Sequence, residues 1–170
     1  VIEKPLKELW DEDLLPYRTL RAQLPMVMIA HAAYPQVTHD QTPASLSKKW
    51  IADILRKRIG YRKLIVSDDL EMGGVLAAAP IGEAAVKHIR IGGDICLVCH
   101  REDHVVQAYE ELVRTAERDV KFAKRVERAA QRVLAFKKKS AKILRGEQVR
   151  LESLNREEND SHESVRRPRR

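Results

Sequence analysis

Lys63-Leu-Ile-Val-Ser67, followed directly by Asp68-Asp-Leu-Glu-Met-Gly-Gly74, is the stretch of sequence that decides the fold. Its first half has the length and apolar composition of a buried β-strand, and its second half is a loop rich in carboxylates. Similar apolar runs occur at residues 26–30 and 94–99. Because helical patterns separate these three runs, the sequence predicts βα units with a parallel sheet.

Five segments are predicted to be helices from apolar residues that recur at helical spacing. They cover residues 6–21, 45–58, 81–91, 103–117 and 120–144. In the second of these helices, Trp50, Ile54 and Leu55 are expected to face the sheet. The 170 residues are too few for a complete (β/α)₈ barrel, which typically needs about 250.

The composition is that of a chain that can bury a core, with 44% hydrophobic and 34% charged residues. No run approaches the roughly 18 apolar residues of a membrane span, and the first residues do not resemble a signal peptide. We therefore expect no membrane partner and a cytoplasmic location. Both cysteines, Cys96 and Cys99, belong to an apolar run, so we predict buried thiols rather than a redox pair or a zinc site. No metal or cofactor is predicted.

The formal net charge is +7, and residues 118–142 contain ten Lys or Arg against two acids. Apolar residues within this segment keep helical spacing, so its basic side chains are expected on the opposite, solvated face. These apolar residues are Phe122, Val126, Ala129, Ala130 and Val133. Beyond Gly146 the sequence is mostly charged and polar, so we predict a folded domain over 1–146 and a disordered tail over 147–170.

Residues that can carry chemistry follow each predicted strand. They are His31 after the first strand, Asp68 and Asp69 after the second, and His100 after the third. Parallel strands end on one face, so these residues should converge and could form a hydrolytic site with a carboxylate as nucleophile or base. Structural roles are also open. Asp69 could cap the following turn. For His31 and His100, the sequence supports a hydrogen-bonded packing role and a role in the site equally. Asp94 is expected to order the turn into the third strand.

Ile65-Val-Ser-Asp-Asp-Leu-Glu-Met-Gly73 resembles the nucleophile signature of the bacterial family 3 glycoside hydrolases, in particular the β-N-acetylglucosaminidases of peptidoglycan recycling. Six further segments are similar to the same family, in the same order, and they include Met28-Ile-Ala-His-Ala-Ala-Tyr-Pro35, Gly92-Gly-Asp94 and Leu97-Val-Cys-His100. The basic segment resembles the helix that closes the family's barrel, and the resemblance extends over residues 1–144.

The resemblance implies the C-terminal part of a TIM-type (β/α)₈ barrel, with about three parallel βα units and the closing helix. It also implies hydrolysis of glycosides of β-linked N-acetylglucosamine with retention of configuration, in which Asp68 is the nucleophile that forms a covalent glycosyl-enzyme. An ionised carboxylate suits this role because the oxocarbenium-like transition state carries positive charge. We assign substrate-binding roles to His31, Met72 and His100, and we expect Met72 to pack beside the sugar.

The family's acid/base element, a Lys-His-Phe-Pro-Gly-His-Gly type motif that precedes the matched part, does not occur in this sequence. The resemblance therefore implies that the N-terminal half of the barrel is a missing partner and that these residues alone have no glycosidase turnover. Two alternatives stay open. One is a broader β-glucosidase of the same family. The other is a non-catalytic α/β module whose basic helix binds nucleic acid, although nucleic acid is not the expected partner.

Overall fold

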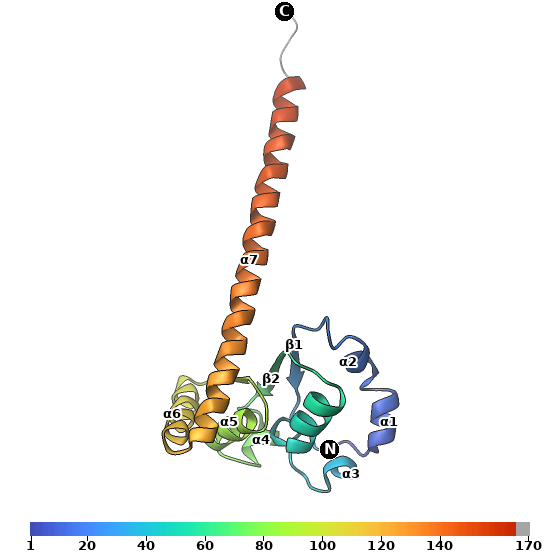
Figure 1. The fold of residues 1–170 in the computed structure, drawn as a ribbon, viewed down its shortest axis with the longest axis vertical. Coiled ribbons are helices and arrows are strands. Elements are labelled where there is room, and N and C mark those ends of the chain that lie inside the picture. The colour runs from blue at the N-terminus through green and yellow to red at the C-terminus, as the bar shows by residue number, and fades with distance from the viewer. Residues whose placement is uncertain (166–170) are drawn as a thin grey trace, which may run out of the picture. The chain divides into compact units, whose positions relative to one another are not determined.

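The computed structural model describes the backbone of residues 1–165 and the side chains of residues 1–147 (Figure 1). Within it the chain forms two compact units, the first over Val1–Val133 and the second beginning at Leu134. The first unit contains the sheet and most of the helices. It also contains all the residues to which the sequence analysis assigned chemistry.

A three-stranded parallel sheet in the order β1-β2-β3 confirms the predicted βα architecture. The strands are β1 (Met26–Ile29), β2 (Leu64–Asp69) and β3 (Ile95–Leu97). Met26 of β1 pairs with Leu64 of β2, and the β2–β3 register shifts between Val66 and Asp69. Strand β2 therefore continues through both aspartates, which the sequence analysis had placed just after the strand.

Helices connect and cover the strands. They are α1 (Leu6–Asp11), α2 (Leu15–Thr19), α3 (Pro35–Thr38), the 3₁₀ turn η1 (Ala44–Leu46), the π-helix η2 (Lys49–Arg58), α4 (Gly73–Leu76), α5 (Ile81–Arg90), α6 (Glu102–Arg118) and α7 (Val120–Val165). None of the helices in the described part of the chain combines the length and hydropathy needed to cross a membrane.

The first two predicted helices are each wrong in detail. The segment 6–21 forms two short helices instead of one, because Pro16 has no amide hydrogen and lies in the first turn of α2, which begins at Leu15 (Figure 1). The segment 45–58 forms a 3₁₀ turn followed by a π-helix. The predicted orientation of this segment is nevertheless confirmed, because Trp50, Ile54 and Leu55 are all buried.

Helix α7 continues well past the predicted end at residue 144 and runs to Val165. The backbone of residues 147–165 is helical, and the disordered tail predicted for 147–170 stays a prediction. Residues 147–165 contain no proline, which would break a helix, and include five Glu, which favour one. Residues 166–170 lie outside the described residues, and the predicted domain boundary at 146 stays a prediction.

Two hydrophobic clusters hold the ends of β2 in place. One packs the sheet against η2 and includes Ile51, Tyr61 and Ile65. The other lies under α4, α5 and α6 and includes Leu70 and Val75, both fully buried. Because Leu70 directly follows the two aspartates, its burial anchors the loop that leaves β2.

A buried ion cluster fixes the start of β3. The Asp94 carboxylate is fully buried, accepts a hydrogen bond from the Ile65 amide at 3.0 Å and pairs with three guanidinium groups. These belong to Arg56 at 2.6 Å, Arg125 at 3.1 Å and Arg132 at 2.6 Å. The expectation that Asp94 orders this turn is confirmed. The expectation of a fully solvated basic face on the last helix is wrong, because Arg125 and Arg132 point inward to satisfy this carboxylate.

Candidate functional site

His31 joins the ends of β1 and β2. Its Nε2 lies 2.8 Å from the backbone oxygen of Asp69, and its Nδ1 lies 2.6 Å from the hydroxyl of Ser45. A carbonyl oxygen can only accept, so Nε2 carries the hydrogen and the Ser45 hydroxyl can donate to Nδ1. Both ring nitrogens are thus engaged within the chain. The structural role considered for His31 is present, and its predicted contact with substrate stays a prediction.

Asp68 and Asp69 point to different surroundings, because successive side chains of a strand alternate. Asp68 is half-buried, and the one hydrogen bond that its carboxylate accepts within residues 1–147 comes from the neighbouring Asp69 amide at 2.9 Å. The Asp69 carboxylate is buried and accepts hydrogen bonds from the amides of Glu71 at 3.1 Å and Cys99 at 3.3 Å. Asp69 therefore caps the turn, which is the structural role that the sequence suggested for it. The Asp68 carboxylate accepts fewer hydrogen bonds than the Asp69 carboxylate.

Glu71 was not singled out by the sequence analysis, and it joins the end of β2 to the start of α6. Its carboxylate accepts hydrogen bonds from the amides of Cys99 at 2.9 Å, His100 at 2.5 Å and Arg101 at 3.0 Å. It also contacts Nδ1 of His104, in the first turn of α6, at 2.8 Å. Burial raises the pKa of Glu71, but these hydrogen bonds outweigh it and leave the pKa below its usual value. The sequence feature that could have identified Glu71 is its position as a further carboxylate two residues after Asp69.

His100 reaches the same carboxylates, as the predicted convergence of strand ends requires. Its side chain is 74% exposed, and Nδ1 lies 2.9 Å from Oδ2 of Asp69 and 3.4 Å from Oε2 of Glu71. Met72, which precedes α4, is also exposed, in the loop that leaves β2. The ends of β2 and β3 thus present acidic groups, an imidazole and an exposed thioether.

The prediction of two buried thiols holds for only one cysteine. Cys96 is partly buried, its Sγ donates to the backbone oxygen of Ala85, and burial raises the pKa of its thiol to about 12. Cys99 is exposed at the end of β3. The pKa of its thiol is also raised, by desolvation first and then by the negative charges of Asp69, Glu71 and Asp68.

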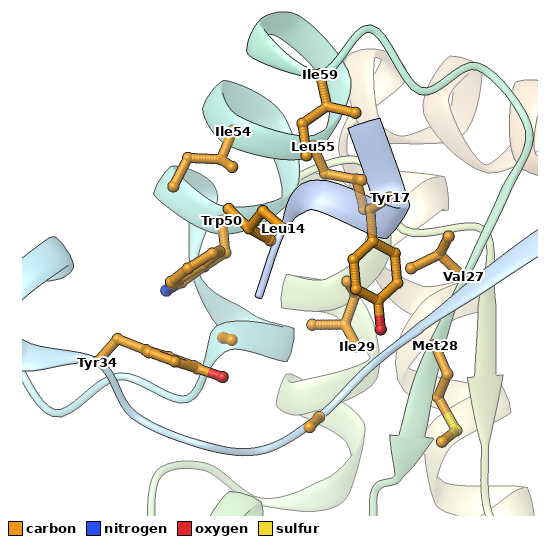
Figure 2. A pocket seen from close by; sticks show the side chains of 12 residues that line it. Leu14, Tyr17, Val27, Met28, Ile29, Tyr34, Trp50, Ile54, Leu55 and Ile59 are labelled. Atoms are coloured by element: carbon orange, nitrogen blue, oxygen red, sulfur yellow. The ribbon is translucent and has the colours of Figure 1, made fainter. Parts of the chain in front are cut away.

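The apolar hollow in Figure 2 lies elsewhere, between β1, η2 and α2. Tyr34 and Trp50 flank it with ring centroids 4.6 Å apart, and Leu14, Tyr17 and Met28 close other sides. None of the residues that line it is charged. The candidate site therefore consists of the polar strand ends and not of this hollow.

A sequence model of a family described as "Glycosyl hydrolase family 3 N terminal domain" matches residues 1–136. The chain belongs to glycosyl hydrolase family 3. The N-terminal domain of this family is a TIM-type barrel, and the three parallel βα units are part of such a barrel. The fold class predicted from the sequence is thereby confirmed.

Several relatives within family 3 carry related names. A beta-hexosaminidase of Aromatoleum aromaticum is 43% identical over 107 residues, which are 62% of this chain and 30% of that protein. The solved β-N-acetylglucosaminidase of Paenibacillus sp. superposes with a TM-score of 0.77 at 31% identity and covers 82% of this chain and 27% of its own. The solved β-N-acetylglucosaminidase of Thermotoga maritima superposes with a TM-score of 0.71 at 32% identity. The match covers 79% of this chain and 30% of the Thermotoga maritima chain. The chain thus spans about 30% of the length of the curated relatives it matches.

Proposed function

We propose that these residues form the nucleophile-bearing part of a family 3 β-N-acetylglucosaminidase, in which Asp68 attacks the anomeric carbon of a terminal N-acetylglucosamine. The observation that carries this proposal is the contrast among the three carboxylates at the strand ends. The carboxylates of Asp69 and Glu71 accept hydrogen bonds from two and three backbone amides, whereas that of Asp68 accepts one hydrogen bond within residues 1–147 and is half-buried. A nucleophile must have a lone pair free to form the new bond, so Asp68 is the group suited to it.

The proposed reaction proceeds in two steps. The Asp68 carboxylate displaces the leaving group from the anomeric carbon and forms a glycosyl ester, which water then hydrolyses with retention of configuration. The leaving oxygen must gain a proton, and we propose that a general acid outside these 170 residues supplies it. The names of the relatives support an N-acetylated sugar in the site.

The surrounding residues have proposed roles that follow from their positions. His31 holds the Asp69 carbonyl and so fixes the backbone beside Asp68. Met72 and His100 are exposed at the strand ends, where they can contact a sugar. We further propose that the natural substrates are fragments from peptidoglycan recycling and that the protein acts in the cytoplasm.

A chimera tests this proposal. Residues 1–133 replace the corresponding segment of the Aromatoleum aromaticum beta-hexosaminidase, which is 43% identical over 107 residues. We expect the chimera to cleave a chromogenic β-N-acetylglucosaminide faster than the matching β-glucoside, and the 170-residue chain alone to give no turnover. Preference for the glucoside would favour the broader β-glucosidase.

Within the chimera, Asp68→Gly should lower kcat by a factor on the order of 10⁴, as loss of one catalytic group does in other hydrolases. Added azide should then attack the vacated face and yield the α-glycosyl azide, because a small anion replaces the carboxylate. Asp40→Asn, a change at an exposed carboxylate between α3 and η1, is the matched control and should keep full activity. Retention of activity in Asp68→Gly would refute the assignment of the nucleophile.

A further inference from the structure

Two buried polar residues that the proposed function does not use are linked by hydrogen bonds to the strand end that carries Asp68. They are Ser45 in η1 and His88 in α5, and both are fully buried. Burying a polar side chain costs free energy unless it is hydrogen-bonded. The partners of these two residues therefore indicate what each one holds in place.

His88 fixes the backbone of Ser45 from the interior. Its Nδ1 lies 2.8 Å from the Ser45 carbonyl oxygen, which can only accept, so Nδ1 carries the hydrogen. Burial lowers the pKa of His88, and the ring is therefore neutral at neutral pH. The ring also packs against Gly93, where an added Cβ would overlap it. The imidazole is thus held between α5, η1 and the turn that precedes β3.

The Ser45 side chain continues this link to His31. Its hydroxyl donates to Nδ1 of His31 at 2.6 Å, and Nε2 of His31 donates to the Asp69 carbonyl oxygen at 2.8 Å. The same carbonyl oxygen accepts a second hydrogen bond from the Met72 amide at 3.0 Å. Because one ring nitrogen accepts while the other donates, the two hydrogen bonds together fix the orientation of the His31 ring.

The last link reaches the carboxylate of Asp68. The Asp69 amide donates to Oδ1 of Asp68 at 2.9 Å, while the Asp69 carbonyl is held by His31. Both backbone groups of Asp69 therefore belong to one chain of hydrogen bonds that begins at His88. Within residues 1–147, Oδ2 of Asp68 accepts no hydrogen bond, and this oxygen is left for bond formation.

We propose that Ser45 is a positioning residue for the nucleophile: its hydroxyl fixes the His31 ring, which holds the Asp69 backbone that orients the Asp68 carboxylate. His88 supports Ser45 from the interior. The role of Ser45 rests on the proposed function, because it concerns the reaction at Asp68. A misplacement of about 1 Å can cost roughly 10²-fold in rate, so a contact outside the reacting groups can control the chemical step.

The test follows formation of the glycosyl ester in the chimera described above. The probe is a ring-fluorinated N-acetylglucosaminide with a dinitrophenolate leaving group, which departs without a proton. Asp68 forms a bond to the anomeric carbon while the dinitrophenolate leaves with the bonding electrons, and fluorine slows hydrolysis of the ester. Mass spectrometry measures the rate constant of labelling and the final fraction of protein labelled.

Ser45→Ala should slow labelling by about 10- to 100-fold and still reach the same final fraction as the unchanged chimera. A purely structural loss would instead lower the final fraction and leave the rate constant unchanged. The matched control is Ser47→Ala, which should label at the unchanged rate. Ser47 is a buried serine in the same segment, and its hydroxyl takes no part in the chain of hydrogen bonds.

Substitutions of His31 test the same chain of hydrogen bonds at its next link. His31→Gln keeps a donor for the Asp69 carbonyl, whereas His31→Ala removes it. The glutamine variant should therefore label about 10-fold faster than the alanine variant, which corresponds to one hydrogen bond. Equal rates in these two variants, or an unchanged rate constant in Ser45→Ala, would overturn the proposed role of Ser45.

NMR of the imidazole nitrogens in the 170-residue chain gives a readout that does not depend on turnover. His31 should carry its hydrogen on Nε2, and in Ser45→Ala its Nδ1 resonance should move to the position of a free lone pair. A hydrogen on Nδ1 in the unchanged chain would overturn the proposal. A chimera that is never labelled would count against the glycosidase function, whereas these NMR results concern Ser45 and His31 alone.

Discussion

Replacing Asp94 by asparagine should remove a large part of the folding free energy of the first unit. The Asp94 carboxylate has 0% side-chain exposure and faces Arg56 and Arg125, which are 15% and 13% exposed, and Arg132, which is 36% exposed. Asparagine keeps the shape but removes the negative charge, and it turns an amide NH₂ toward guanidinium donors. Breaking a buried ion pair on one side costs about 3–5 kcal/mol.

The lower end of that range, about 3 kcal/mol, is the expected loss, because Arg132 remains partly hydrated and can recover some solvation. The total free energy of unfolding of a domain of this size is about 5–15 kcal/mol. Urea unfolding followed by tryptophan fluorescence measures the change, since Trp50 is buried. Asp53→Asn, which removes an exposed partner of Lys57, should leave the curve unchanged. A loss below about 1 kcal/mol in Asp94→Asn would refute the view that this carboxylate holds the arginines in place.

The same cluster predicts a dependence on pH. Burial raises the pKa of Asp94, but hydrogen bonds from Arg132 and the Ile65 amide, with the charge of Arg56, outweigh it and lower the pKa below its usual value. The stabilisation is therefore fully present above the pKa of the unfolded chain, near 4, and is lost as the pH falls through the lower folded value. The stability difference between the unchanged chain and Asp94→Asn should shrink in acid. A difference that grew in acid would contradict this.

Three further changes test other parts of the first unit. Gly93→Ala should destabilise it by about 1–3 kcal/mol, measured by urea unfolding, because a Cβ there would overlap the ring of the fully buried His88. Glu71→Gln should speed amide hydrogen exchange in the loop before α6. Because the pKa of Glu71 is lowered in the folded chain, the carboxylate stabilises the fold at neutral pH, and this stabilisation should disappear as the pH falls through the folded-state pKa. Alkylation at neutral pH followed by peptide mass spectrometry should label the exposed Cys99 before Cys96, whose pKa is raised to about 12 by burial.

Each of these tests has a control or a result that would contradict it. Gly146→Ala, where nothing lies within 4 Å of the added carbon, should not destabilise the chain. Unchanged exchange at residues 99–101 in Glu71→Gln would show that the carboxylate does not order this loop. Equal labelling of both thiols would mean that β3 opens faster than the reagent reacts.

The order of strands and helices followed from the sequence, because hydrophobic periodicity reports which residues of a local segment are buried. The parallel sheet, the burial of Trp50 and the meeting of Asp69 with His100 were all predictable in this way. The family could be recognised from the Ser-Asp-Asp-Leu-Glu-Met segment, since residues 1–136 match its model. The continuation of α7 past residue 144 was not predicted, because the sequence beyond Gly146 has few apolar residues at helical spacing.

Only the tertiary structure decided which charges meet. The contacts of Asp94 with Arg125 and Arg132 join residues 31 and 38 positions apart, and those of Glu71 with His104 join residues 33 apart. Periodicity places a charged side chain on the polar face of its own helix or in its own loop, but it contains no information about a partner on another element. A buried carboxylate must be neutralised where the chain brings it, so the folded arrangement of β2, β3, α6 and α7 selected these partners.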